Sequence, residues 1–205
     1  MIEFLNKRSA ANSTSAPIAY FYCERNAIEP QRADPDEIMQ SILKQLSCSG
    51  SDFSIKEPVV KMYKERKEEA EEDGCDPAKL TANECTELIL KILDSSSANI
   101  VIDALDECDP IRRHILLRAL DEIIQKSASL VKLFVSSRDD NDIVYQLATS
   151  PNVYIRASDN GEDIQRFVRS EVHQCIADKR LLGGDVSETM KTRIIATLVK
   201  GSQGM

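Results

Sequence analysis

The sequence predicts an α/β domain built around a mainly parallel sheet. Along the 205 residues, short runs rich in β-branched and aromatic residues alternate with longer stretches of helical periodicity, an order typical of β-α-β units. One run, at residues 99–103, stays apolar until it ends in Asp103, as expected of a buried strand. Hydrophobic residues make up 42% and charged residues 29% of the chain, which is typical of a folded globular protein.

The first half of the chain contains one predicted strand and three predicted helices. Residues 18–23 (IAYFYC) form the strand. A helix follows from Asp34, which caps it, with Pro35 in its first turn and Glu37 completing a capping box. The next helix spans 58–73, where Lys and Glu recur at i,i+4, and we interpret it as an exposed, ion-paired face rather than a binding surface. Another capping box, formed by Thr81 and Glu84, opens a helix whose apolar face carries Cys85, Leu88, Ile89, Ile92 and Leu93.

The second half continues the alternation. Its strands are predicted at residues 99–103, 131–136 and 153–157. A helix is expected to begin at Asp109-Pro110, and further helices are expected at 142–148, 160–178 and 187–200, with a break at Gly183-Gly184.

Charge and composition exclude several classes of protein. The 26 basic and 34 acidic residues leave a net charge of −8, so a chain-wide nucleic-acid interface is not expected, and a nucleic-acid ATPase is disfavoured. Because no apolar run reaches the length of a membrane span and residues 1–10 do not resemble a signal peptide, we expect a cytoplasmic protein with no membrane contact. The 6 cysteines have irregular spacing without a C-x-x-C pair, which favours free thiols over a zinc site or disulfides.

Three acidic residues end the apolar strand at 99–103 and begin the loop after it. In an open α/β sheet, ligands bind beyond the carboxyl ends of the strands. There Asp103 could hold Mg²⁺ beside the phosphates of a nucleotide, and Glu107 could act as the catalytic base with Asp106 in support. The alternative, an acidic loop without a chemical role, explains these acids by themselves equally well.

A second polar cluster follows the next predicted strand. Ser137 and Arg138 come directly after the run 131–136, and one crossover helix separates that run from Asp103, so the two strand ends should be neighbours. We therefore predict Ser137 and Arg138 as nucleotide-binding residues, with Arg138 directed at the γ-phosphate. A solvated arginine at a strand end is the alternative.

These motifs, in this order, resemble the NACHT group of STAND P-loop NTPases, and most closely fungal NLR-like proteins and the nephrocystin-3-like N-terminal domain. The segment IDALDEC at 102–108 is similar to the family's Walker B strand, and FVSSR at 134–138 is similar to its sensor strand. Further likenesses are AYFYC at 19–23 with Arg25-Asn26, RADP at 32–35, the helix with Ile38, Leu43 and Gln45-Leu46, Asp163-Ile164, and the segment 200–205. The resemblance implies a three-layer P-loop NTPase fold and a signalling switch that uses Mg²⁺ with ATP or GTP.

The glycine-rich phosphate loop of that family, G-x-x-x-x-G-K-[ST], does not occur at the expected place, since no glycine precedes Gly50. We therefore expect a partial domain whose P-loop strand is missing: residues 1–17 a remnant helix and loop, 18–180 the partial NTPase domain, and 181–205 the start of a C-terminal helical subdomain. The missing strand would leave 131–136 and 153–157 each with an unpaired flank, so we expect the isolated chain to be poorly stable or prone to aggregate.

Two functions follow from this resemblance. The chain would be a fragment of a switch that binds and slowly hydrolyses a nucleoside triphosphate in its intact parent, with protein partners or self-assembly through the missing domains. By itself it would then be inactive. The alternative is a degenerate or truncated interaction module, without enzymatic activity, that does not bind nucleotide.

Overall fold

The computed structural model describes residues 16–48, 54–155 and 159–202. The chain forms two compact units, which divide between Ala148 and Thr149. Most of the predicted remnant at 1–17 lies outside the described residues, as do residues 203–205. The predicted boundaries at 17/18 and 180/181 stay predictions.

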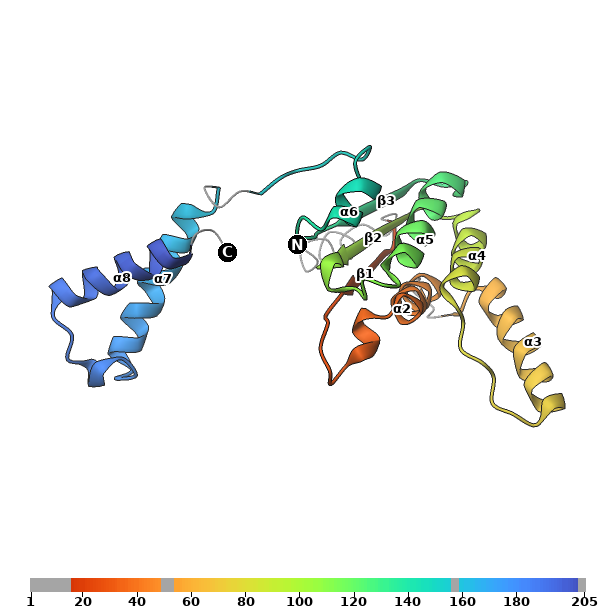
Figure 1. Cartoon of the computed structure of the whole chain (residues 1–205). Coiled ribbons are helices and arrows are strands. Elements are labelled where there is room, and N and C mark those ends of the chain that lie inside the picture. The colour runs from red at the N-terminus through yellow and green to blue at the C-terminus, as the bar shows by residue number, and fades with distance from the viewer. Residues whose placement is uncertain (1–15, 49–53, 156–158, 203–205) are drawn as a thin grey trace. The chain divides into compact units, whose positions relative to one another are not determined.

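A three-stranded parallel sheet forms the centre of the first unit (Figure 1). Its strands are β1 (Ile18–Tyr22), β2 (Ala98–Asp103) and β3 (Val131–Val135), in the order β1-β2-β3. Tyr20 lies opposite Val101, and Val101 lies opposite Phe134. Because parallel neighbours need a crossover connection, helices separate these strands in the chain. The predicted α/β class is confirmed.

The helices of the first unit are α2 (Pro35–Ser47), α3 (Glu57–Asp73), α4 (Ala82–Leu93), α5 (Arg113–Lys126) and α6 (Asn141–Gln146). Helix α2 contacts β1 and α4, and α5 contacts α4 and β3. Ala19, Ile100 and Ile102 alternate along β1 and β2 and belong to the same buried cluster as the apolar stripes of these three helices. The core therefore lies between one face of the sheet and α2, α4 and α5, and all five apolar residues predicted for α4 are buried in it.

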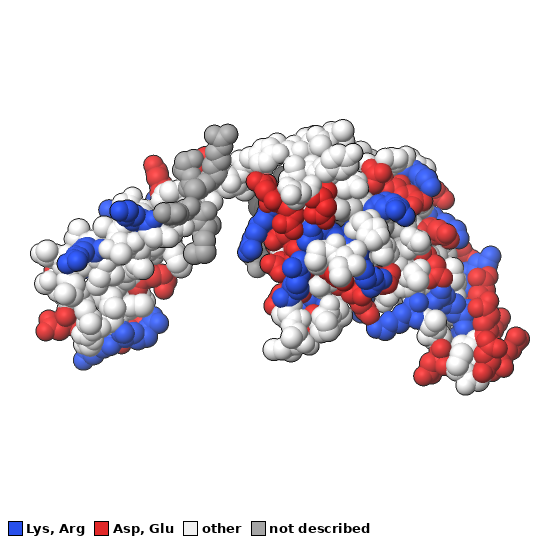
Figure 2. Space-filling model, in the orientation of Figure 1, with Lys and Arg blue, Asp and Glu red and all other residues white. Residues whose placement is uncertain are grey.

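Charged side chains cover α3, as Figure 2 shows. Two of the predicted i,i+4 ion pairs are present, Lys61–Glu65 at 3.9 Å and Lys67–Glu71 at 3.6 Å. Ala70 is the buried residue of this helix. Such exposed pairs contribute little stability, as expected for a helix whose surface is mostly solvated.

Helix starts agree only partly with the predicted caps. Asp34 caps α2 by accepting a hydrogen bond from the Asp36 N–H at 2.8 Å, but the expected capping partner Glu37 pairs with Lys79 instead. The Thr81–Glu84 capping box of α4 is formed in both directions.

Helix α5 begins three residues later than predicted. It starts at Arg113 because residues 110–112 form a turn whose N–H groups at Arg112 and Arg113 donate to the Asp109 carbonyl, at 3.1 and 2.7 Å. The Asp109 N–H is itself held by the carbonyl of Ala33 at 2.9 Å. Ile111, which a helix beginning at Pro110 would include, is 81% exposed in this turn.

The second unit contains α7 (Gly161–Ala177), the 3-10 turn Leu182–Gly184 and α8 (Glu188–Ser202). The two helices contact each other, and Val172 of α7 is buried. The predicted strand at 153–157 is wrong over its described part: residues 153–155 form no strand, and Val153 is 90% exposed. A β-rich run becomes a strand only where a neighbour takes its backbone hydrogen bonds, and none does so here among the described residues. Residues 156 and 157 lie outside them.

No helix in the described ranges is long and apolar enough to cross a membrane.

Candidate functional site

The carboxyl ends of β2 and β3 meet at one edge of the sheet. Ile102 is paired with Val135, so that the next residues, Asp103 and Ser136, are neighbours. The Ser136 hydroxyl donates a hydrogen bond to Oδ1 of Asp103, and the Ser136 N–H donates to the carbonyl of Ile102 at 2.9 Å. Both predicted clusters therefore lie at the same edge, as expected for parallel strands.

A tight turn after Asp103 places the other two acids. Ala104 adopts the left-handed conformation with φ 53°, which is uncommon for a residue with a Cβ. Its N–H donates to Ser136 Oγ at 3.1 Å, and the Leu105 N–H donates to the Ser136 carbonyl at 2.9 Å. Leu105 is buried and anchors the turn. Asp106 and Glu107 follow in a short 3-10 helix, half-buried at the edge.

Asp106 and Arg138, which lie on different loops, are in direct contact. Oδ1 of Asp106 accepts a hydrogen bond from the Arg138 backbone N–H at 3.1 Å, and Oδ2 lies 3.5 Å from Nε of Arg138. The Asp106 side chain is 10% exposed, whereas that of Arg138 is 82% exposed. Asp106 thus anchors the loop after β3, and most of the guanidinium of Arg138 remains available to another anion.

The other two predicted residues, Glu107 and Ser137, have side chains that make few hydrogen bonds. The Glu107 N–H donates to the Ala104 carbonyl at 2.9 Å, and its carboxylate accepts no hydrogen bond within the described ranges. The Ser137 hydroxyl donates to the carbonyl of Arg138 at 2.8 Å and is exposed. The structure places Glu107 and Ser137 near the edge through the backbone, with no hydrogen bond between their side chains.

Two arginines that are not among the predicted site residues bind the same turn. The Nη2 atom of Arg25 donates to the carbonyls of Asp106 and Cys108, at 2.7 and 2.9 Å. The Nη2 atom of Arg113 donates to the same two carbonyls, at 2.7 and 3.3 Å. One sequence signal could have indicated that Arg113 is buried. It precedes Leu116 and Leu117 by three and four positions, a helical spacing that puts all three on the buried face of α5.

The cysteines at this edge are not nucleophiles at neutral pH. Burial, with a smaller effect from nearby acids, raises the pKa of Cys23 to about 12. Burial likewise raises the pKa of Cys108 to about 11, and its thiol donates to the Ala33 carbonyl at 3.3 Å. Since the thiolate is the reactive form, these side chains serve in packing. All six cysteines are free thiols.

The acids fit a shared magnesium site better than a self-contained one. In the described parts of the chain, no three His, Cys, Asp or Glu residues cluster closely enough to hold a metal ion by themselves. Mg²⁺ in nucleotide sites is commonly held by one or two carboxylates, with phosphates and water as the other ligands. Asp103 suits that role, because Ser136 engages one of its oxygens and the other accepts no hydrogen bond from any described residue.

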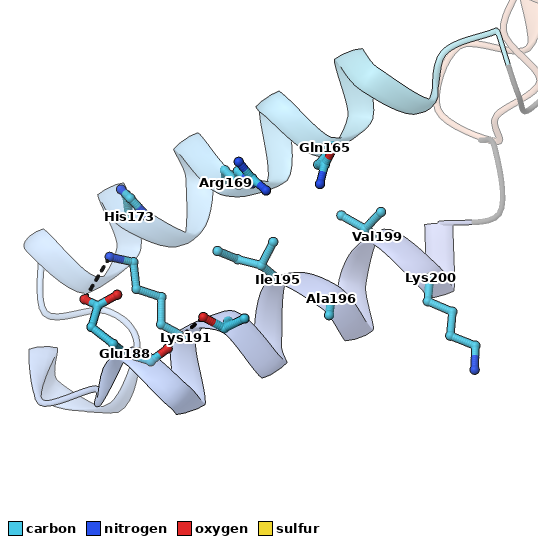
Figure 3. Close-up of a pocket in the computed structure, with 10 residues that line it drawn as sticks. Gln165, Arg169, His173, Glu188, Lys191, Ile195, Ala196, Val199 and Lys200 are labelled. Carbon is cyan, nitrogen blue, oxygen red and sulfur yellow. Dashed lines mark hydrogen bonds and ion pairs between the residues drawn. The ribbon is translucent and has the colours of Figure 1, made fainter.

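A separate groove of about 610 Å³ runs between α7 and α8 (Figure 3). Ile195 and Val199 point from α8 toward α7, and Arg169 and His173 lie on α7. Lys191 pairs with Glu188 at its rim, at 3.3 Å. The described residues that line it include none of the five predicted site residues.

Comparison with known proteins identifies the family. The sequence model of the nephrocystin 3 N-terminal family matches residues 1–138, a span that includes β1, β2, β3 and all five predicted site residues. No curated protein and no solved structure matches the chain. The match confirms the nephrocystin-3-like resemblance, whereas the NACHT and fungal NLR-like assignments stay predictions. The chain belongs to the nephrocystin 3 N-terminal family.

Proposed function

We propose that this chain carries the Walker B and sensor strands of a nucleotide-dependent signalling switch. The nucleoside triphosphate, with Mg²⁺, would bind at the carboxyl edge of β2 and β3. The observation that carries the proposal is the contact between Asp106 and Arg138, which joins the acidic turn after β2 to the cationic loop after β3. That edge thereby combines carboxylates for a metal ion with a cation for phosphate.

Each predicted residue has a role in this proposal. Asp103 would hold Mg²⁺ directly or through water, and Ser136 keeps its carboxylate oriented. Glu107 would act as the base toward the attacking water, because its carboxylate is half-buried and makes no hydrogen bond to any described residue. Asp106 would support Glu107 by holding the turn to the next loop. Arg138 and Ser137 would contact the nucleotide.

Binding of a fluorescent ATP or GTP analogue with Mg²⁺ tests the proposal. The comparison includes the 205-residue chain and the longer protein in which any phosphate loop encoded upstream of Met1 is present. We expect the longer protein to bind in a Mg²⁺-dependent manner, and Asp103→Ala to abolish binding. The matched control is Asp121→Ala, which removes an exposed acid of α5. Equal binding by the two variants would refute the role of Asp103.

Hydrolysis separates the base from the metal ligand. In the longer protein, Glu107→Gln should preserve nucleotide binding and slow hydrolysis about 100-fold or more, because general-base catalysis contributes at least that factor. If Glu107→Gln hydrolyses nucleotide as fast as the unmodified protein, then Glu107 is not the base.

A non-enzymatic interaction module is the second candidate. It is favoured by the internal pairing of Asp103 with Ser136 and of Asp106 with Arg138, which gives each acid a partner without a ligand. If the longer protein binds neither nucleotide at micromolar concentration, this candidate replaces the switch. Mg²⁺-dependent binding that Asp103→Ala abolishes would exclude it.

A further inference from the structure

Among the residues that the structure describes, one arginine is buried, and it contacts the loops of the candidate site. Arg113 is the first residue of α5, and its side chain is 1% exposed, although arginine is rarely buried unless it is paired. Burying a guanidinium costs considerable free energy, and only well-formed hydrogen bonds and nearby carboxylates offset that cost. The contacts of Arg113 therefore indicate what the residue does.

The two ends of this guanidinium bind two different loops. Nη1 donates to Oδ2 of Asp140 at 3.0 Å and to both carboxylate oxygens of Asp142 at 2.9 Å. Nη2 donates to the carbonyls of Asp106 and Cys108. Arg113 thus joins the start of α5, the turn after β2 and the segment that runs from the loop after β3 into the first turn of α6.

These are the two loops that carry the candidate site. Asp106 and Glu107 lie on the turn after β2, and Arg138 lies on the loop after β3. Arg113 contacts the backbone of the first loop, Asp140 at the end of the second loop and Asp142 in the first turn of α6. It makes no hydrogen bond to the carboxylates of Asp103, Asp106 or Glu107. Its contacts therefore act on the placement of those residues and not on a bound ligand.

Stability alone does not explain a charged side chain here. The Nε atom of Arg113 is buried and has no hydrogen-bond partner among the described residues, so the network leaves one donor unsatisfied. Replacing a buried ion pair by apolar side chains is often neutral or stabilising. What an apolar residue could not do is bind two carbonyls and two carboxylates in fixed directions.

We propose that Arg113 is a positioning residue that couples the turn after β2 to the loop after β3, so that a change in one loop is transmitted to the other. In the context of the proposed function, on which this consequence rests, a phosphate that reorients Arg138 would shift the turn that carries Glu107. The coupling itself is a property of the chain without nucleotide.

Hydrogen–deuterium exchange of the full chain, followed by mass spectrometry, tests the coupling. The key variant is Asp140→Asn/Asp142→Asn, which leaves Arg113 in place and changes only the loop after β3 and the first turn of α6. We expect amide exchange of residues 104–109 to accelerate about tenfold, the change that corresponds to the loss of one charge-assisted hydrogen bond. Exchange in α4, which Arg113 does not hydrogen-bond, should not change.

Two further variants complete the design. Arg113→Met should accelerate exchange in both 104–109 and 138–142, whereas the control Arg118→Met, an exposed arginine of the same helix, should change neither loop. Faster exchange that stays confined to 138–146 in the double variant would overturn the coupling. So would acceleration that is equal in α2, α4 and both loops, because that pattern indicates general destabilisation. If Arg113→Met does not fold, the double variant decides by itself.

The outcome is independent of the proposed function. Mg²⁺-dependent nucleotide binding is measured separately on the longer protein, and its absence would refute the switch without affecting the exchange result. Conversely, nucleotide binding together with unchanged exchange at 104–109 in the double variant would retain the switch and reject Arg113 as its positioning residue.

Discussion

One side chain takes both backbone hydrogen bonds of Tyr20 at the outer edge of β1, and its removal makes a quantitative prediction. Gln45 of α2 donates from Nε2 to the Tyr20 carbonyl at 2.8 Å and accepts from the Tyr20 N–H at 3.0 Å. The side-chain amide thereby takes the place that a peptide group of another strand would occupy. Gln45→Met keeps the length of the side chain and removes both hydrogen bonds.

The cost follows from these two bonds. A hydrogen bond contributes about 0.5–1.5 kcal/mol net, so that two contribute about 1–3 kcal/mol. Tyr20 is half-buried, and water can therefore rehydrate its backbone only in part. We expect the free energy of unfolding to fall by about 2 kcal/mol. With a urea dependence of about 1–3 kcal/mol per molar, the urea midpoint should fall by roughly 1 M.

Urea unfolding followed by far-ultraviolet circular dichroism measures this change, since the chain has no tryptophan. The matched control is Gln125→Met, which removes an exposed side chain whose hydrogen bond, to Asp121 at 2.7 Å, stays within α5. This control should change stability by less than about 0.5 kcal/mol. If both variants unfold at the same urea concentration, Gln45 does not stabilise the edge of β1.

The remaining predictions concern a cap, a carboxylate and the thiols. Thr81→Ala should lower the free energy of unfolding by about 1 kcal/mol because it removes the capping box of α4, whereas Thr81→Ser should not, as urea midpoints will show. Hydrogen bonds from the backbone and hydroxyl of Thr81, with a contribution from Arg66, lower the pKa of Glu84. Its stabilisation is therefore present above the unfolded-state pKa of about 4.3 and is lost as the pH falls through the lower folded-state value. Between about pH 6 and 3 the urea midpoint of the unmodified chain should consequently fall more than that of Glu84→Gln, and parallel curves would contradict this. Burial raises the pKa of Cys23 and of Cys85 to about 12. It raises the pKa of Cys108 to about 11. Iodoacetamide at about pH 8 should therefore label the exposed Cys48 and Cys75 but reach these three only after unfolding, as peptide mass spectrometry will show; native labelling of Cys108 at the rate of Cys48 would contradict the buried placement.

Structural features that depend on residues within one helical turn of each other were predicted well. The cap of α2 at Asp34 and the reciprocal box of Thr81 and Glu84 are present in the structure. Both involve residues at most three positions apart, and the geometry of a helix start is nearly the same in every protein. The three strands of the sheet were located to within one residue for the same reason, because β-rich runs there end at clear turn signals.

The errors arose where a distant partner competed with the local signal. Glu37 pairs with Lys79 in place of its own helix terminus, and the hydrogen bond from Asp109 to Ala33 holds the chain outside α5 for one more turn. At 153–155 a partner was missing instead: the run is β-rich, but no strand pairs with it among the described residues. No pattern within a short window contains these partners.

The candidate site likewise contains features that the sequence predicts and contacts that it does not. That Asp103 and Arg138 lie at the same edge of the sheet was predictable, because the carboxyl ends of neighbouring parallel strands must coincide. That Asp106 holds Arg138, and that Arg113 binds both loops from below, was not. The contacts of Asp106 with Arg138 and of Arg113 with Asp140 join residues 32 and 27 positions apart, and their formation depends on the register between β2 and β3.

The sequence by itself determined the three strands of the sheet, most of the helices and the residues that follow the strand ends, since propensity, capping and apolar periodicity are local properties. Only the tertiary structure decided the strand order β1-β2-β3, the pairing of Tyr20 with Gln45 at its edge and the burial of Arg113. The physical reason is that desolvation makes a buried polar group depend on its partners. Those partners are brought together only when the sheet and its helices pack.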